Sequence, residues 1–467
     1  MSERERSQRE RGSEEGRARG ARAGRPVRGG GRLRSEWDRE IARLAVPAFG
    51  ALVAEPAYVL ADTAIVGHLG TPQLAGLAVA AAILITGYSI FIFLAYGTTA
   101  AVARLIGAGD EPDAAHQAVQ SVWLALAISA LVVPVGLVLS GRLVRAFGAT
   151  GDAAGYAETY LSISLLGVPA MLVTYATVGY LRGRQDTRTP LVVAVVAAAA
   201  NLVLEVVLIL GLGYGVGASA ASTVLVQWGA AAVYLAGMGR RTAELGVRLR
   251  PAPRAIGRLA RVGVALIVRT VALRLAFTSA TAVAARLGTA EVGAHQIAFE
   301  IWIALALALD AIAIAGQALV GRLLGAGDVA ATRAATRRMI EISAAFGLVV
   351  GLLILATRGL LPHAFSDDPE VLALTSFLLL FVGAMQPVNG VVFALDGVLM
   401  GAGDMRYLAV SMVLAALLFL GAAAVLLATG AGLGWLWTAI LGLMLARLVA
   451  LTARIRGDRW LVVGAVR

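Results

Sequence analysis

The sequence predicts an all-α membrane protein with twelve transmembrane helices in two six-helix repeats, related by a pseudo-two-fold axis along the membrane normal. Of its 467 residues, 59% are hydrophobic and 15% are charged, and the mean hydropathy is +0.81. Soluble domains have about a quarter of their residues charged, so this composition is typical of an integral membrane protein. The number of apolar stretches and an internal repeat supply the rest of the prediction.

Twelve apolar stretches have about the 20-residue length that crosses a bilayer. In the first half they lie at 41–66, 74–103, 115–139, 157–181, 189–212 and 217–238. In the second half they lie at 259–284, 292–321, 336–356, 371–400, 407–429 and 432–453. Each half therefore contributes six spans.

The two halves repeat one another at a constant offset along the chain. The segment 98–110, TTAAVARLIGAGD, returns at 316–328 as GQALVGRLLGAGD, with eight of thirteen positions identical. Pro169 and Pro387 keep the same offset. Six spans return the chain to the side where it began, so both halves are expected to insert the same way up.

Arginines gather in the loops on one side of the predicted membrane. Three lie between residues 182 and 188, after the fourth span, and seven lie in the central connector between 240 and 261. Short cytoplasmic loops retain positive charge, so this side is predicted to be cytoplasmic. Both termini fall on it, and we expect a multi-pass protein of the cell (plasma) membrane.

Three regions are predicted along the chain. Residues 1–38 form a basic tail, because residues 1–34 hold eleven arginines and five glutamates among small and polar residues. Such a composition cannot bury a core, so the tail is expected to be disordered and cytoplasmic. Residues 39–250 form the N-lobe with spans one to six and the central connector, and residues 251–467 form the C-lobe with spans seven to twelve.

Residue types that the sequence lacks exclude several classes of function. It contains no cysteine and no lysine, which removes thiolate metal sites, cysteine nucleophiles and the lysine of a Walker A phosphate loop. The four histidines are scattered without metal-ligand spacing. We therefore expect neither an enzyme nor a metal site, and no nucleic-acid partner, since no patch of aromatic and basic residues is present.

The first span carries two acids. Glu55 and Asp62 are seven residues apart, which places them on one face of a helix, two turns from each other. Pro47 and Pro56 interrupt the backbone hydrogen bonds of the same helix and allow it to bend. A helix of this kind is predicted to act as a gate coupled to protonation. The alternative is that Asp62 caps local backbone while Glu55 bonds to a neighbouring helix.

The fifth span carries Asn201 and Glu205, one helical turn apart and on a common face. A carboxylate beside a carboxamide can hold a proton, a sodium ion or a water. The alternative is a polar clamp between helices, which contributes about 1 kcal/mol.

Charges in the second half are predicted to form a C-lobe network. An unpaired guanidinium inside the membrane would be very costly, so its arginines are expected to pair structurally with acids of later spans, with proton relay as the alternative. The predicted network comprises Arg269, Arg274, Glu300, Asp310, Asn389 and Asp396. At the repeat offset, Asp62 and Glu205 both meet alanines, Ala280 and Ala423, so the repeats share a scaffold but not these acids.

Long ordered strings identify a resemblance to a known family. They include EPAYVLADTAIVGHLG, NLVLE, RLGTAEVGAHQIAFEIW and QPVNGVVFALDGVLMGAGD. Together with the two six-span repeats, they resemble the MATE (multidrug and toxic compound extrusion) family, in particular its DinF-like branch, over nearly everything after about residue 39.

The resemblance implies cation-coupled antiport by alternating access. The family's first-span aspartate falls on Asp62 and its bend-forming proline on Pro47. Its fifth-span pair Asn-x-x-x-Asp falls on Asn201 and Glu205, where this chain has glutamate in place of aspartate. The glutamate keeps the charge but reaches further, which leaves the choice between protons and sodium open.

We expect an antiporter, with protons favoured over sodium, that exports lipophilic and often cationic drugs or metabolites. H⁺ or Na⁺ would be the coupling ion, and no resident cofactor is expected. The expected partners are a small-molecule substrate and membrane lipid, and the chain is expected to be a monomer. The alternative function is a flippase for a lipid-linked precursor, which has a related architecture.

Overall fold

The computed structural model describes residues 30–465, with side chains from residue 36 on and without that of Glu55. The chain divides into two units, Met1–Glu40 and Ile41–Arg467. The described part of the first unit, residues 30–40, is helical, and the packing reported below belongs to the second unit. Residues 1–29 of the predicted disordered tail, 1–38, lie outside the described residues, and residues 30–38 are helical.

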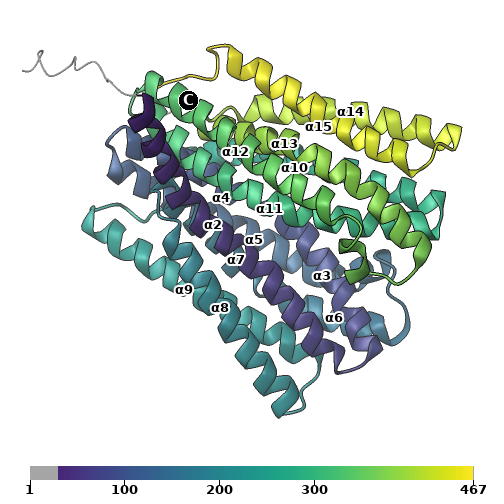
Figure 1. The fold of residues 1–467 in the computed structure, drawn as a ribbon. Coiled ribbons are helices and arrows are strands. Elements are labelled where there is room, and N and C mark those ends of the chain that lie inside the picture. Colours follow the sequence, from purple (N-terminus) through teal and green to yellow (C-terminus); the bar gives the residue numbers. More distant parts are fainter. Residues whose placement is uncertain (1–29, 466–467) are drawn as a thin grey trace, which may run out of the picture. The chain divides into compact units, whose positions relative to one another are not determined.

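Helices make up the first half of the described chain. They are α2 (Gly30–Gly67), α3 (Thr71–Phe91), α4 (Phe93–Gly107), α5 (Glu111–Ala146), α6 (Gly151–Leu165), α7 (Val168–Gly183), α8 (Arg188–Glu205) and α9 (Val216–Glu244). After Glu205, α8 continues into a π-helical turn, Val206–Gly211. From residue 41 on, Figure 1 shows these helices, purple to teal, beside those of the second half.

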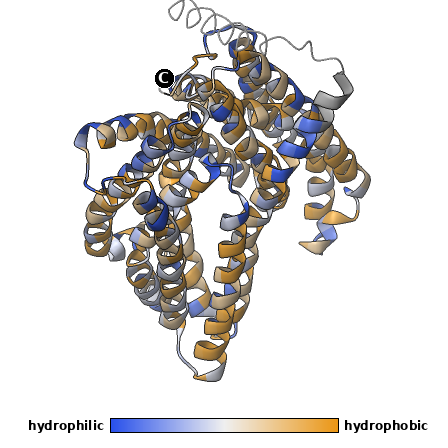
Figure 2. Cartoon of the chain, turned by 90° about the vertical axis from the view of Figure 1, so that its left-hand side faces the viewer, coloured by the Kyte–Doolittle hydropathy of each residue, from blue (hydrophilic) through white to orange (hydrophobic). Residues whose placement is uncertain are grey.

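The second half is helical in the same way. Its helices are α10 (Pro253–Leu287), α11 (Thr289–Gly325), α12 (Val329–Thr357), α13 (Pro369–Gly401), α14 (Met405–Thr429) and α15 (Leu433–Arg456). A short 3₁₀ helix, Leu361–Ala364, lies between α12 and α13. In Figure 2 most of the helix length is apolar, and polar residues gather toward loops and helix ends.

The predicted spans agree with these helices. Within the described residues, eleven helices are long and apolar enough to cross a membrane, or twelve if α6 and α7, which meet at a 49° bend, are one span. Each predicted stretch falls on one of these segments to within one residue at its ends. The prediction of an all-helical membrane fold is therefore confirmed.

A four-residue motif ends one helix and begins the next at four places: GAGD at 107–110, 325–328 and 401–404, and GRQD at 183–186. Its third residue always has a positive φ, with 81° at Gly109, 63° at Gln185, 76° at Gly327 and 74° at Gly403. This left-handed conformation terminates helices. The aspartates Asp110 and Asp328 then cap the next helix by accepting backbone N–H groups 3.0 and 2.8 Å away. The motif thus has a structural role in both repeats.

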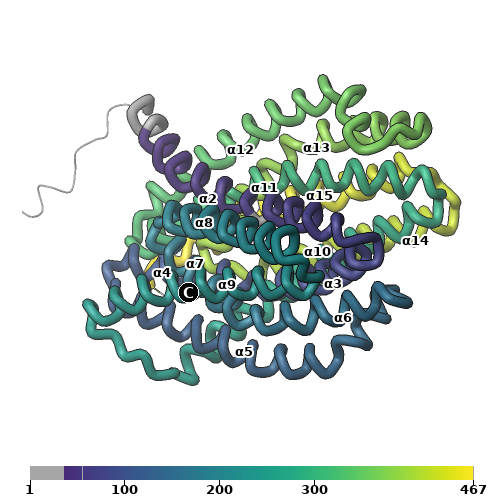
Figure 3. The backbone as a smooth tube through the Cα atoms, turned by 90° about the horizontal axis from the view of Figure 1, so that it is seen from below, coloured from purple at the N-terminus to yellow at the C-terminus, as the bar shows by residue number. Residues whose placement is uncertain are grey.

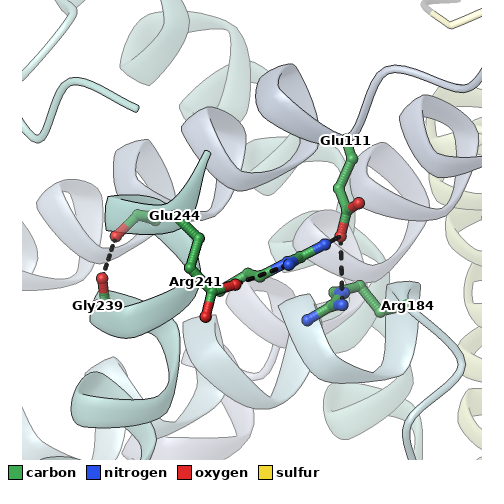
Figure 4. Close-up of polar contacts among 6 residues, drawn as sticks. Glu111, Arg184, Gly239, Arg241 and Glu244 are labelled. Carbon is green, nitrogen blue, oxygen red and sulfur yellow. Dashed lines mark hydrogen bonds and ion pairs between the residues drawn. The ribbon is translucent and has the colours of Figure 1, made fainter. Parts of the chain in front are cut away.

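Ion pairs join three N-lobe helix ends beside these loops (Figure 4). At the start of α5, Glu111 Oε1 lies 2.7 Å from Arg241 Nη2 of α9 and 3.2 Å from Arg184 Nη2, just after α7. Arg241 Nη1 also lies 2.7 Å from Glu244 Oε2. Ion pairs that solvent reaches contribute little to stability, so this group mainly orients the helix ends.

The two lobes meet closely where α4 crosses α11. A Cβ atom added to Gly107 would lie 1.9 Å from the Arg322 carbonyl oxygen, and one added to Gly325 would lie 2.0 Å from the Arg104 carbonyl oxygen. Gly107 and Arg104 are the repeat equivalents of Gly325 and Arg322, so the contact is the same one seen from each lobe. Only glycine permits this approach of two backbones. We call the contact of Gly107 and Gly325 with the opposite helix the seam. Figure 3 shows the helices α4 and α11 from below.

Gly325→Ala is predicted to destabilise the fold, because the added methyl group would collide with backbone rather than with a flexible side chain. Overpacking of this kind costs about 1–3 kcal/mol. Thermal unfolding of the purified protein in detergent measures the effect. Gly442→Ala in α15 is the matched control, since no described atom lies within 4 Å of its added Cβ. Equal melting temperatures for the two variants would contradict the close seam.

Candidate functional site

A cavity of about 270 Å³ lies inside the N-lobe, among α2, α3, α6, α7, α8 and α9. Small and aliphatic side chains make up most of its wall, and four tyrosines line it as well, namely Tyr58, Tyr88, Tyr160 and Tyr234. Asp62 is the acid on its wall, and Asn201 and Gln227 supply carboxamides. A largely apolar cavity with a few converging polar groups is typical of small-molecule sites.

Asp62 is held on the cavity wall by neighbours from three helices. It is 4% exposed, and the Ser219 hydroxyl of α9 donates to its Oδ1 at 2.5 Å. The side chains of Tyr160 and Glu205 also lie close enough to the Asp62 carboxyl to interact with it electrostatically. The first-span and fifth-span acids, which are far apart in sequence, are therefore brought together.

Glu205 is fully buried at the end of α8. Asn201 Nδ2 donates to its Oε1 at 2.5 Å, and the Ser222 hydroxyl of α9 lies 3.5 Å from the same oxygen. The predicted pairing of Asn201 with Glu205 on one helix face is present in the structure. The π-helical turn begins at the next residue, and such turns occur often at functional sites.

Several buried polar atoms around the cavity lack a hydrogen-bond partner among the described residues. They are Ser164 Oγ, Gln227 Oε1, Asn201 Oδ1 and Glu205 Oε2. A buried polar atom left unpaired costs about 1–3 kcal/mol. Water or a bound substrate in the cavity would satisfy these atoms, whereas Tyr58 is already bonded to Thr223 at 2.8 Å.

The other two candidates on α2 differ from Asp62. Pro47 is half-buried outside the cavity wall, and α2 runs through Pro47 and Pro56 as one unbroken helix. The Glu55 side chain lies outside the described residues. Its predicted role on the same face as Asp62 therefore stays a prediction.

The C-lobe contains a smaller charge network than the sequence predicts. Asp396 of α13, 4% exposed, pairs with two arginines: Arg269 Nη2 of α10 lies 2.6 Å from its Oδ2, and Arg447 of α15 bonds to the same oxygen. Two guanidinium groups on one carboxylate leave the cluster with an excess positive charge. Asn389, on the same helix, is buried, and its Oδ1 has no partner among the described residues.

Asp310 contacts the other lobe. Its Oδ2 accepts from the Tyr96 hydroxyl of α4 at 3.2 Å, and the Tyr96 carbonyl accepts from Gln317 of α11 at 2.5 Å. Arg182 of α7 and Arg269 both act electrostatically on Asp310. The sequence predicts pairing inside the C-lobe, but this carboxyl reaches between the lobes, because α11 packs on α4 at this depth.

Arg274 and Glu300 do not join the network. Both are exposed, and neither forms an ion pair with another described residue; Glu300 instead accepts from Gln296 one turn earlier at 2.8 Å.

Sequence reasoning missed four partners in these sites: Ser219, Tyr96, Arg182 and Arg447. Arg447 could have been found, since it lies inside an apolar span like the residues that were selected. Ser219 and Tyr96 carry no sequence signal, because single hydroxyl groups are common in membrane helices.

Within the described residues, no group of three or more His, Cys, Asp or Glu side chains could hold a metal ion.

The MatE family model matches two stretches of this chain, residues 47–207 and 265–425. The second match begins and ends at the positions that the offset of the internal repeat assigns to the ends of the first. Each match lies within one lobe; the first includes Asp62 and Glu205, and the second includes Asp310 and Asp396.

Curated proteins of three kinds are similar over most of the chain. Protein DETOXIFICATION 44, chloroplastic, of Arabidopsis thaliana is 33% identical over 88% of this chain and 81% of its own. A probable multidrug resistance protein NorM of Xanthomonas axonopodis pv. citri (strain 306) is 31% identical over 74% of this chain and 77% of its own. DNA damage-inducible protein F of Escherichia coli (strain K12) is 28% identical over 81% of this chain and 84% of its own.

Solved structures share the fold. A crystal structure of MATE in the bent conformation aligns with a TM-score of 0.83 at 23% identity, covering 92% of this chain and 98% of that one. A MOP superfamily transporter from Pyrococcus furiosus Vc1 (DSM3638) aligns with a TM-score of 0.82 at 22% identity, covering 93% and 99%.

Asp396→Asn is predicted to destabilise the protein by about 3–5 kcal/mol, because it removes the carboxylate that compensates two buried guanidinium groups. Thermal or denaturant unfolding in detergent measures the loss. Glu300→Gln is the matched control, since it makes the same chemical change at an exposed acid outside the network. If Asp396→Asn unfolds at the same temperature as the unchanged protein, the two-arginine pairing does not stabilise the C-lobe.

Proposed function

The chain belongs to the MatE family of membrane transporters, and on that premise we propose that it is a proton-coupled antiporter that exports lipophilic cations. The observation that carries the proposal is that two buried and interacting acids, Asp62 and Glu205, lie at the N-lobe cavity, with Asp62 on its wall. Family membership makes it a multi-pass transporter rather than an enzyme. The coupling ion and the class of substrate are what we propose here.

The acid pair supports coupling to protons. Two neighbouring carboxyl groups in a buried site repel each other strongly when both are charged, so the pair is expected to retain a proton when no other cation is present. A substrate cation that enters the cavity would supply the positive charge in place of that proton. Binding of the proton and binding of the cation then become mutually exclusive, which is the requirement for antiport.

The cavity wall supports a lipophilic cation as cargo. Aliphatic side chains favour an apolar body, and tyrosine rings attract a positive charge over their faces. Ser164, Gln227 and Asn201 offer polar atoms that still lack partners among the described residues. A lipid-linked precursor would instead call for a cationic cavity, and no observation of this cavity favours that alternative.

Sodium is the second candidate ion. Na⁺ would need several oxygen ligands, and Asp62, Glu205 and Ser219 could supply some of them. The proton is favoured because Asp62 Oδ1 already accepts from Ser219 and Glu205 Oε1 already accepts from Asn201, both at 2.5 Å, so these two oxygens are held by hydrogen-bond donors. Separate pH and sodium gradients across proteoliposomes distinguish the two.

The driving force can be sized. Each pH unit provides about 1.4 kcal/mol per proton, and each 100 mV about 2.3 kcal/mol per net charge moved. Exchange of one proton for one monovalent cation moves no net charge, so only the pH term would drive it. Export against a steep concentration gradient of the substrate would therefore need more than one proton per cation.

We further propose that the seam lies on the cytoplasmic side of the cell membrane, with both termini on that side. Supporting this orientation, the GAGD loops, Arg184, Arg241 and the arginine-rich connector all lie at the same helix ends as the seam. The acid pair and the cavity are built within one chain, which supports a monomer as the functional unit.

Asp62→Asn is predicted to abolish proton release on addition of substrate, because an amide cannot give up the shared proton. The measurement is the pH change when a lipophilic cation such as ethidium is added to detergent-purified protein or proteoliposomes. Asp152→Asn, at an exposed acid at the start of α6, is the matched control and should release as much as the unchanged protein. Full release from Asp62→Asn would remove Asp62 from the mechanism.

Ala198→Phe is predicted to reduce ethidium binding at least about tenfold, because the ring would fill part of a cavity of about 270 Å³ whose wall includes Ala198. Equilibrium binding by fluorescence measures the effect. Ala199→Phe adds the same ring on the exposed side of α8 and should bind normally. Equal affinities of the two variants would show that the cargo binds elsewhere.

A further inference from the structure

The chain after α15 crosses the junction between the lobes. Residues 457–465, which we call the C-terminal strap, leave the helix at Gly457, where φ is −88° and ψ is 174°. The repeat-related positions of the first half are 239–247, and the first six of them, 239–244, are still helical at the end of α9. The strap is therefore a departure of the second repeat from the common scaffold.

Three contacts anchor the strap to the C-lobe. The Trp460 ring is 1% exposed, and its Nε1 donates to the Ile455 carbonyl at 3.1 Å. Asp458 Oδ1 lies 2.5 Å from Arg333 Nη2 of α12. The Gly464 N–H donates to the carbonyl of Leu324, near the end of α11, at 3.0 Å.

The strap also binds the N-lobe. Arg104 of α4 is 3% exposed, and its Nη2 donates to the Val462 carbonyl at 2.6 Å, while its Nη1 donates to the Ala402 carbonyl of the C-lobe at 3.1 Å. Ala465 packs against an N-lobe core cluster that includes Val102 and Leu105. One buried guanidinium thus joins α4 to the strap and to the loop after α13.

These contacts lie at the seam. The Arg104 carbonyl is the atom that Gly325 approaches, so the same residue takes part in the backbone contact and in the contact with the strap. Charge-assisted hydrogen bonds are among the stronger polar contacts, and they are stronger still where water is excluded. Separation of the lobes at this end would have to break the bonds of Arg104 and expose Ala465.

We propose that the C-terminal strap is a conformational clasp, which holds the lobes together at the seam and sets how often the transporter opens there. The inference rests on alternating access as the mode of transport. The strap stays with the C-lobe during opening, because Trp460, Asp458 and Gly464 bind it to that lobe. Its contacts with Arg104 and the N-lobe cluster are the ones that form and break.

Spin-label distances across the seam test the clasp. The chain contains no cysteine, so Asp113→Cys at the start of α5 and Ala330→Cys at the start of α12, both exposed, give one labelled pair without background. Double electron–electron resonance in proteoliposomes then reports the fraction of molecules with the lobes apart at this end.

Two variants release the strap by different means. A stop codon after Trp460 removes residues 461–467 and keeps the buried tryptophan. Gly464→Pro removes the N–H that bonds to Leu324 and places a non-glycine residue where φ is 103°. Gly457→Ala is the matched control, because its φ of −88° suits alanine and the nearest described atom to the added Cβ is 3.8 Å away.

Both release variants are expected to raise the ratio of open to closed molecules about tenfold, and Gly457→Ala should leave it unchanged. One outcome would overturn the clasp and leave alternating access intact. In it, the release variants give the same distances as the unchanged protein, although ethidium or a pH gradient still changes the distances in the unchanged protein. If neither the variants nor a gradient changes the distance between the two spin labels, alternating access is overturned, and the clasp with it.

Discussion

Two neighbouring carboxyl groups buried inside a membrane repel each other strongly when both are charged, and the rest of the N-lobe site depends on this constraint. Asp62 and Glu205 come from α2 and α8, and Ser219, Tyr160 and Asn201 hold them together. Desolvation makes charge in such a site costly unless a cation compensates it. The pair can therefore hold either a proton or a compensating cation, and a cavity of the right polarity lies directly beside it.

Alternation between two states requires that the lobes separate without losing their own packing. Each lobe has internal polar contacts that do not cross to the other, such as Asp396 with its two arginines. Contacts between the lobes include the seam glycines, Asp310 and Gln317 with Tyr96, and Arg104 with the strap. A rigid-body movement of the lobes would break contacts of this kind and keep those inside each lobe, which is consistent with two-state behaviour of a packed interface.

Much of the fold could be predicted from sequence, because the apolar lengths and the internal repeat fix the number and the order of the spans. The helical pairing of Asn201 with Glu205 also follows from spacing alone. Contacts between distant helices do not: nothing in the sequence brings Asp62 to Ser219, or turns Asp310 toward the N-lobe. Arg274 and Glu300 were predicted to be paired because charges in membranes usually are, but both lie on exposed helix surface.

The most direct test of the shared proton is infrared difference spectroscopy of the purified protein with and without a lipophilic cation. A protonated buried carboxyl absorbs apart from carboxylates, and its band shifts in D₂O. The account predicts that substrate removes one such band in the unchanged protein and that Glu205→Gln alters or eliminates it. A spectrum with no protonated carboxyl that responds to substrate would contradict a proton held between Asp62 and Glu205.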